Sequence, residues 1–141
     1  MDQKIGNVCT RNVVTVTPAT TVAEAAALMR KNHIGAVVIV EERAGARVPT
    51  GILTDRDIVI EVVAVGLDGK TIKVAEIVQR QLATVKSDAT CSEVVREMSI
   101  QGVRRMPVVN PDGTLVGILT TTNCLEALIW FSKQVQLAGR K

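Results

Sequence analysis

The feature that most constrains the fold of this chain is an internal repeat with a constant spacing. The tetrapeptide Gly51-Ile52-Leu53-Thr54 recurs as Gly117-Ile118-Leu119-Thr120, 66 positions later. Other identical pairs lie 69 positions apart: Thr15 and Thr84, Val16 and Val85, Thr21 and Thr90, Glu24 and Glu93, Met29 and Met98, and Val40 and Val109. A single offset, shortened only at one turn, indicates a duplication. We therefore expect two repeats, residues 1–70 and 71–141, that fold alike.

Each repeat predicts the order strand, helix, strand, strand, helix. In the first repeat the expected elements are strand 13–16, a helix from the cap Thr21 to just before His33, strands 36–40 and 48–53 around a turn at 41–45, and helix 55–65 ended by Gly66. In the second they are strand 82–85, a helix from Thr90 to about 101, strands 106–109 and 115–119, and helix 121–138 ended by Gly139. Short helical turns at 5–8 and 74–78 are each expected to pack across the other half. Two half-cores that bury their sheet faces together predict one α/β (α+β) globular module.

Composition narrows the possible classes of protein. The 141 residues are 47% hydrophobic but only 1% aromatic, so the core must consist of Val, Ile, Leu, Ala and Met. The net charge is +3, and the basic residues are scattered along the sequence, with Arg104-Arg105 an internal basic pair. No aromatic residues alternate with these basic residues. Nucleic-acid binding is therefore poorly supported. The sequence lacks a signal region and a membrane span, and its three cysteines are widely spaced, which favours a soluble, cytoplasmic protein without disulfides.

Few residues could carry catalysis or hold a metal. His33 is the sole histidine, none of the cysteines lies beside a base motif, and neither a Walker-type loop nor a metal-ligand cluster occurs. An enzyme needs titratable groups that converge on a pocket, so we expect no enzymatic activity, no metal site and no required cofactor. His33 itself is interpreted as a helix-end residue.

The repeated tetrapeptide also suggests a binding function. In Thr54-Asp55-Arg56-Asp57 a strand runs into a helix whose first turn offers a hydroxyl and then a carboxylate. Free N–H groups at such a position suit phosphate, and a carboxylate suits ribose hydroxyls. Thr54 and Asp57 also fit a capping pair, in which each side chain binds the other residue's backbone N–H. Both interpretations stay open, and for Thr54 they are compatible.

These residues resemble a known family. The combination of Thr-Val-x-Pro before a Thr-Val-x-Glu-Ala helix, the strand Arg105–Asn110 and the doubled Gly-Ile-Leu-Thr is similar to a tandem pair of cystathionine-β-synthase (CBS) domains, a Bateman module. Leu53–Leu67 further resembles bacterial stand-alone CBS-pair proteins. The resemblance covers roughly Ile5 to Leu128. It implies a pseudo-two-fold pair of repeats, a homodimer, and adenosine ligands (AMP, ADP, ATP or NAD, sometimes S-adenosylmethionine) in clefts between the repeats.

The resemblance also implies the site residues. Thr54 would contact phosphate and Asp57 ribose, with Arg56 as a possible phosphate ligand, while adenine would lie against backbone near Thr15 and residues 34–38. The expected nucleotide-binding residues are Thr15, Val16, Ile34, Gly35, Ala36, Val38, Thr54, Arg56 and Asp57 in the first repeat, and Thr84, Val103, Arg104, Arg105, Met106, Pro107, Thr120, Thr122 and Asn123 in the second. One of the two adjacent arginines would face a ligand.

The second repeat departs from the pattern at Asn123, where an amide replaces the carboxylate. A hydrogen bond to a charged group contributes about 1.5–3 kcal/mol and a neutral one about 0.5–1.5 kcal/mol, so, for two otherwise equal sites, this one should bind ribose about tenfold or more weakly. The resulting hypothesis is a regulatory adenosine-nucleotide sensor that acts through a separate, unknown effector protein. The alternative is a structural or interaction module with vestigial clefts. The apolar stretch Leu125–Phe131 is interpreted as a dimer face or as a cover over the core.

Overall fold

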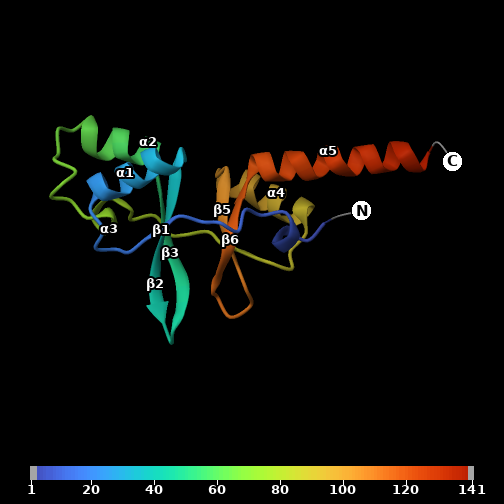
Figure 1. The fold of residues 1–141 in the computed structure, drawn as a ribbon, viewed down its shortest axis with the longest axis horizontal. Helices are drawn as coiled ribbons and strands as arrows, with labels where there is room; N and C mark the ends of the chain where they lie inside the picture. The colour runs from blue at the N-terminus through green and yellow to red at the C-terminus, as the bar shows by residue number, and fades with distance from the viewer. Residues whose placement is uncertain (1–2, 140–141) are drawn as a thin grey trace. The chain divides into compact units, whose positions relative to one another are not determined.

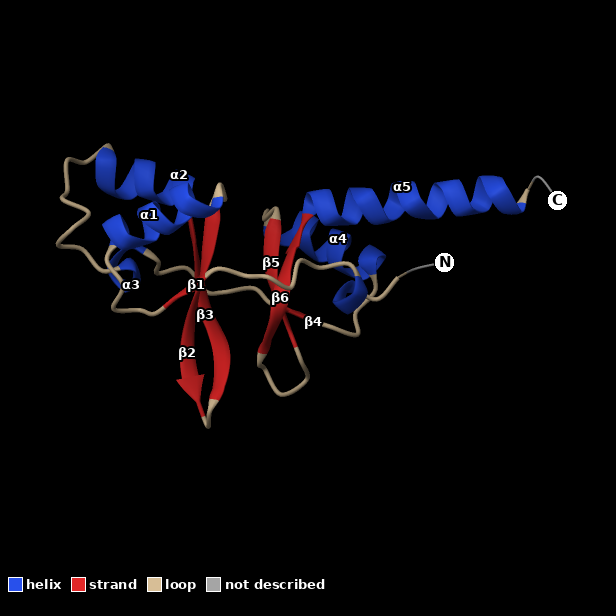
Figure 2. Ribbon diagram, viewed as in Figure 1, coloured by secondary structure: helices blue, strands red, loops and turns tan. Residues whose placement is uncertain are grey.

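The computed structural model describes residues 3–139 and confirms the mixed α+β fold class (Figure 1). The chain forms two compact units. One comprises Val13–Leu82, and the other comprises the residues up to Asn12 together with those from Ala83 onward. Each unit contains a three-stranded sheet in which a parallel strand joins an antiparallel hairpin (Figure 2).

The Val13–Leu82 unit contains the first sheet, in the order β1-β2-β3. Its elements are β1 (Thr15–Val16), α1 (Val22–Asn32), β2 (Ala36–Arg43), β3 (Ala46–Thr54), α2 (Asp55–Ile58), the π-helical turn η2 (Val59–Val63) and α3 (Val74–Ile77). The predicted helix 55–65 thus exists as α2 and η2, and Gly66 follows it with the expected positive φ of 74°. The buried face of α1, Val22, Ala25 and Met29, packs into one core with residues of the sheet.

The second unit repeats this order. Its elements are η1 (Ile5–Asn7), β4 (Val85–Lys86), α4 (Cys91–Gln101), β5 (Arg105–Val109), β6 (Leu115–Thr120) and α5 (Thr121–Ala138). Val94 and Met98 on α4 pack against Met106, Val108 and Leu119 of the sheet. The expected bounds of α4 and α5 are confirmed, and α5 continues past the sheet of its unit (Figure 2).

Two strand predictions were wrong in length. The strands expected at 13–16 and 82–85 are reduced to two residues each, Thr15–Val16 and Val85–Lys86. These are the residues in register with the neighbouring strand, Thr15 with Val38 and Val85 with Val108. A parallel strand is defined by its pairing, which apolar character alone does not reveal.

The turn expected at 41–45 is also shorter than predicted, because β2 extends to Arg43. The connection to β3 consists of Ala44 and Gly45, with φ of 53° and 79°. Two consecutive positive φ angles match the twist of a two-residue hairpin, which explains why the polar residues before them can remain in the strand.

The short segments before each repeat pack as predicted on the other half. Ile5 is fully buried in the core of the second unit, and its backbone N–H donates to the Ala89 carbonyl at 2.9 Å. Val74 is fully buried in the core of the Val13–Leu82 unit, and its N–H donates to the Thr20 carbonyl at 2.8 Å. Each core is therefore completed by a segment that precedes the other repeat in the sequence.

Candidate functional site

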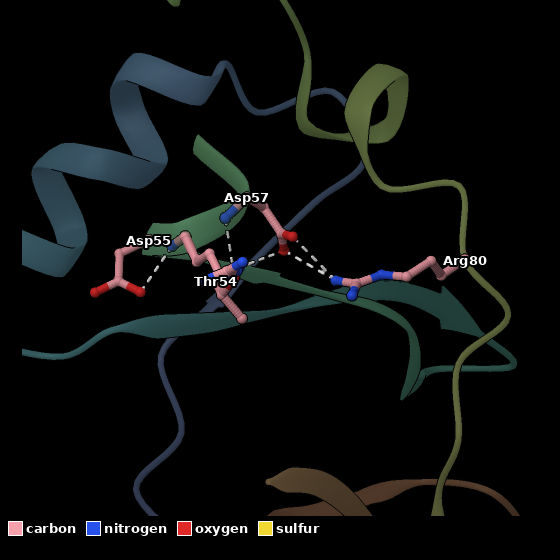
Figure 3. A network of polar contacts seen from close by, with 5 residues as sticks. Thr54, Asp55, Asp57 and Arg80 are labelled. Atoms are coloured by element: carbon pink, nitrogen blue, oxygen red, sulfur yellow. Dashed lines mark hydrogen bonds and ion pairs between the residues drawn. The ribbon is translucent and has the colours of Figure 1, made fainter. Parts of the chain in front are cut away.

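The turn from β3 into α2 has the geometry of a capping box (Figure 3). The Thr54 hydroxyl accepts a hydrogen bond from the Asp57 backbone N–H at 3.1 Å, and Asp57 Oδ2 accepts from the Thr54 N–H at 2.9 Å. These two bonds satisfy amides at the helix start and fix the rotamers of both side chains. The capping interpretation is thus confirmed for the described structure, and it holds a carboxylate in a defined position at the end of β3.

The Asp57 carboxylate also pairs with Arg80. One guanidinium nitrogen of Arg80, Nη2, lies 3.1 Å from Oδ1 and 3.0 Å from Oδ2 (Figure 3). Arg80 follows α3 and lies in the segment that leads toward β4. The Arg80 side chain is 67% exposed and that of Asp57 only 19%. A pair with one such exposed partner contributes about 0–1 kcal/mol, so it forms and breaks readily.

The start of β2 lies against the same turn. Ala36 is the cross-strand partner of Thr54, and the Asp55 N–H donates to the Gly35 carbonyl at 2.9 Å. A Cβ atom at Gly35 would lie 3.1 Å from Asp55 Oδ2, so glycine permits this close approach. The structure therefore brings together four of the expected site residues, Gly35, Ala36, Thr54 and Asp57.

The other expected residues of this unit lie farther along the sheet. Thr15 and Val38 are cross-strand partners, and the Thr15 hydroxyl accepts a hydrogen bond from Arg47 at 3.2 Å. Val16 is buried, Ile34 is half-buried against the core, and the Arg56 side chain is exposed. An open groove of about 490 Å³ adjoins β1 and α1, and its lining residues are Thr15, Val16, Thr17, Thr20, Glu24, Ala27, Leu28 and Lys31. The groove thus shares Thr15 and Val16 with the expected site but includes neither Thr54 nor Asp57.

The second unit has an equivalent turn between β6 and α5. Asn123 Oδ1 accepts from the Thr120 N–H at 3.0 Å, and the Thr120 hydroxyl accepts from the Asn123 N–H at 3.1 Å. Arg105 is the cross-strand partner of Thr120, and the Arg104 carbonyl accepts from the Thr121 N–H at 3.0 Å. The amide therefore reproduces the cap of the first unit without its charge.

The remaining expected residues of the second unit differ in what they could offer a ligand. Met106 and Pro107 are buried, so their contribution would come from backbone groups. Val103 is half-buried, whereas Thr84, Arg104 and Thr122 are exposed. The structure groups Arg105 with Thr120 and Asn123, and it leaves Thr84 outside the strands, directly before β4.

Arg80 is the residue that the sequence analysis missed. The same 69-residue offset that reveals the duplication relates Arg80 to Arg11, and this match could have drawn attention to both. Arg11 makes a different contact: its guanidinium donates to the Gly6 carbonyl at 2.6 Å. The two equivalent arginines thus occupy different environments in the two units.

The chemistry of the cysteines fits packing rather than catalysis. Cys124 is buried, and Cys9 and Cys91 pack against the core of the second unit. Burial raises the pKa of the Cys9 and Cys124 thiols, which lowers their thiolate content at neutral pH. Among residues 3–139, no three His, Cys, Asp or Glu side chains are grouped so that they could hold a metal ion. Within the same range, none of the helices has the length and apolar character needed to cross a membrane.

Comparison with known proteins identifies the class to which this fold and these turns belong. The chain is a member of the CBS domain family, whose model matches residues 5–64 and 74–129. CBS pairs of this kind are regulatory modules.

Particular relatives support this assignment. An uncharacterised protein of Methanopyrus kandleri is 38% identical over 122 residues, which are 86% of this chain and 61% of that protein, so the chain spans less than two thirds of its length. A crystal structure of Hypoxic Response Protein I with two coordinated zinc ions matches with a TM-score of 0.77 and 32% identity, over 88% of this chain and 98% of that one. The CBS domain protein PAE2072 of Pyrobaculum aerophilum, complexed with AMP, matches with a TM-score of 0.77 and 25% identity, over 86% of this chain and 89% of that one.

Proposed function

We propose that this chain is a non-catalytic regulatory module that binds an adenosine nucleotide (AMP, ADP, ATP or NAD) and signals the energy state of the cell to a separate effector protein. The observation that carries the proposal is the Thr54–Asp57 turn, where two backbone hydrogen bonds hold a partly exposed carboxylate beside a hydroxyl. A fixed carboxylate can accept hydrogen bonds from the two ribose hydroxyls, and the neighbouring hydroxyl can donate to a phosphate. The AMP complex of the Pyrobaculum aerophilum protein supports the same ligand class.

The proposal keeps the eighteen expected nucleotide-binding residues and the repeat extents 1–70 and 71–141. In the first repeat, Thr54 would bind phosphate, Asp57 would bind ribose, and the backbone of β1 and β2 would bind adenine. The second repeat would supply a weaker site around Thr120 and Asn123.

The test is calorimetric titration of ligand-stripped protein with AMP, ADP, ATP, NAD and GTP, for wild type and Asp57→Asn. Asn123 shows that asparagine keeps the same cap, with its Oδ1 3.0 Å from the Thr120 nitrogen, so Asp57→Asn should fold normally. We expect one adenosine nucleotide to bind and Asp57→Asn to weaken it about tenfold, because a charged acceptor becomes neutral. Asp88→Asn, which removes an exposed carboxylate elsewhere, is the matched control. Failure of every adenosine nucleotide to bind at millimolar concentration would reject the proposal in favour of an interaction module.

Self-association as a homodimer is part of the proposal. Exposed apolar residues recur at equivalent positions on the last helix of each repeat, Val59 with Leu125 and Val63 with Ile129, each pair 66 positions apart. Apolar side chains exposed on both repeats are typical of a surface that another chain covers. Light scattering after size exclusion should give twice the 15.1 kDa chain mass, and Leu125→Glu should return the protein to the monomer. A wild-type monomer at the concentrations used for crystallography would reject this part.

A further inference from the structure

The Asp57 carboxylate, which we propose binds ribose, already has a partner within its own unit. Asp57 Oδ2 accepts from the Thr54 N–H at 2.9 Å and from Arg80 at 3.0 Å, and Oδ1 accepts from Arg80 at 3.1 Å. An ionised carboxylate has about four acceptor positions on its two oxygens. Three are therefore occupied, whereas two ribose hydroxyls would need two positions.

Of these three contacts, the one to Arg80 is the easiest to break. The Thr54 contact belongs to the capping box and fixes the start of α2, so its loss would cost helix stability. The Arg80 side chain is 67% exposed and contacts the carboxylate through a single nitrogen rather than through the parallel pair of bonds that guanidinium can form. A ribose diol can displace such a contact at a cost of a few-fold in affinity.

The displaced guanidinium would remain beside the ligand. Arginine stays charged at all physiological pH values, and its planar donors match the oxygens of a phosphate. The Thr54 hydroxyl, the proposed phosphate contact, lies one hydrogen bond from the backbone of Asp57. Thr54 and Arg80 both contact Asp57 (Figure 3), so we expect a phosphate bound to the Thr54 hydroxyl to be within reach of the Arg80 side chain.

We propose that Arg80 is a ligand-exchange residue: it occupies the Asp57 carboxylate when no ligand is bound, yields that carboxylate to the ribose, and then binds the nucleotide phosphate. This inference rests on the proposed function and deepens it. Arg80 would then determine selectivity for AMP over adenosine. Either ligand must break the contact between Asp57 and Arg80, but only a ligand with a phosphate forms a new contact with Arg80 in return.

The second unit differs at both of the corresponding positions. Its equivalent arginine, Arg11, donates to the Gly6 carbonyl, and Asn123 offers a neutral amide in place of the carboxylate. Selection for a phosphate by exchange is therefore confined to the Asp57 site.

The experiment measures the affinities of adenosine and AMP by calorimetry for wild type, Arg80→Ala and Arg43→Ala. Arg43 is an exposed arginine of the β2–β3 hairpin, and it pairs with Glu41 rather than with Asp57. Arg43→Ala therefore serves as the matched control for Arg80→Ala. We expect Arg80→Ala to weaken AMP about tenfold or more, since a charge-assisted contact to phosphate is lost. Adenosine should bind Arg80→Ala as well as wild type or up to about fivefold more tightly, because its competitor is gone. Arg80→Lys should retain part of the AMP affinity, and Arg43→Ala should change neither ligand.

The results separate this inference from the function on which it rests. If wild type binds AMP, Asp57→Asn weakens it, and Arg80→Ala leaves the AMP-to-adenosine ratio unchanged, the exchange is wrong and the nucleotide site stands. An equal loss of both ligands in Arg80→Ala would likewise overturn the exchange, because it would indicate a structural role. If wild type binds neither adenosine nor AMP, the exchange is rejected, and the proposed function is rejected as well only when ADP, ATP and NAD also fail to bind.

Discussion

The two glycines of the repeated tetrapeptide should differ sharply in their tolerance of alanine. In β3, a Cβ at Gly51 would lie 3.2 Å from the side-chain tips of Ile39 and Val78. In β6, a Cβ at Gly117 would lie 2.5 Å from the backbone oxygen of Thr10. The side chains of Ile39 and Val78 can rotate away from a new methyl group at Gly51. The Thr10 oxygen belongs to the main chain and can move only if its whole segment moves. The same substitution therefore tests two different kinds of packing.

The expected loss of unfolding free energy in each variant depends on which atoms the new methyl group must displace. At Gly51, slight overpacking is offset by the roughly 0.4–1 kcal/mol that alanine gains by restricting the unfolded chain, so the net loss should stay below about 1 kcal/mol. At Gly117 the segment around Thr10 must move away. This breaks the paired backbone bonds between Thr10 and Ile118, at 3.0 and 2.9 Å, each contributing about 0.5–1.5 kcal/mol. With overpacking included, Gly117→Ala should cost about 2–4 kcal/mol.

Urea unfolding followed by circular dichroism measures both losses, and trypsin provides a local readout. If the segment detaches, cleavage after Arg11 should be faster in Gly117→Ala than in wild type, and unchanged in Gly51→Ala. Equal losses of stability for the two variants, or no change in cleavage after Arg11, would refute the argument that the main-chain contact of Thr10 decides the difference.

Three further predictions concern His33, the cysteines Cys9 and Cys124, and Asp112. His33 ends α1 with a left-handed φ of 51°, where the second repeat has Gly102 at 68°, so His33→Gly should raise stability by about 0.5–1 kcal/mol in urea unfolding; a loss would show that the imidazole makes compensating contacts. Burial raises the pKa of Cys9 and Cys124, so the folded state keeps protons that the unfolded chain releases. The contribution of these protonated thiols to the free energy of unfolding should be fully present below about pH 8.5 and be lost as the pH rises toward their folded-state pKa. A free energy of unfolding that stays constant from pH 8 to 10 would contradict this. The Thr114 N–H and hydroxyl lower the pKa of Asp112, so its NMR titration midpoint should lie below that of a peptide aspartate, and a normal midpoint would mean the turn is open in solution.

Much of the fold could be predicted because the repeat supplied each element twice. The caps at Thr21 and Thr90 and the boundaries of α4 follow from local hydrogen-bonding chemistry, which the sequence displays directly. The lengths of β1 and β4 could not be obtained in this way, because they depend on which residues find a partner in the neighbouring strand. The left-handed cap at His33 was also missed, since a residue with a side chain rarely adopts that conformation.

The site was predictable to a similar degree. The Thr54 and Asp57 pair could be found because its spacing is that of a capping box and because it matches a family pattern. Its ion pair with Arg80 joins residues 23 positions apart, and neither composition nor periodicity carries information about such a contact. Only the match between Arg11 and Arg80 in the repeat hinted at it.

The exchange of short segments between the two cores has a consequence for the order of events during synthesis. Ile5 leaves the ribosome before the Val13–Leu82 unit, yet the core that buries it includes Leu119 and Cys124, which are made after that unit. The Val13–Leu82 unit, by contrast, takes its closing segment, Val74–Ile77, from chain that follows β3, α2 and η2 within the same unit. Nascent chains should therefore complete the Val13–Leu82 core first, while Ile5–Asn12 stays exposed to proteases and chaperones until β6 and α5 have been synthesised.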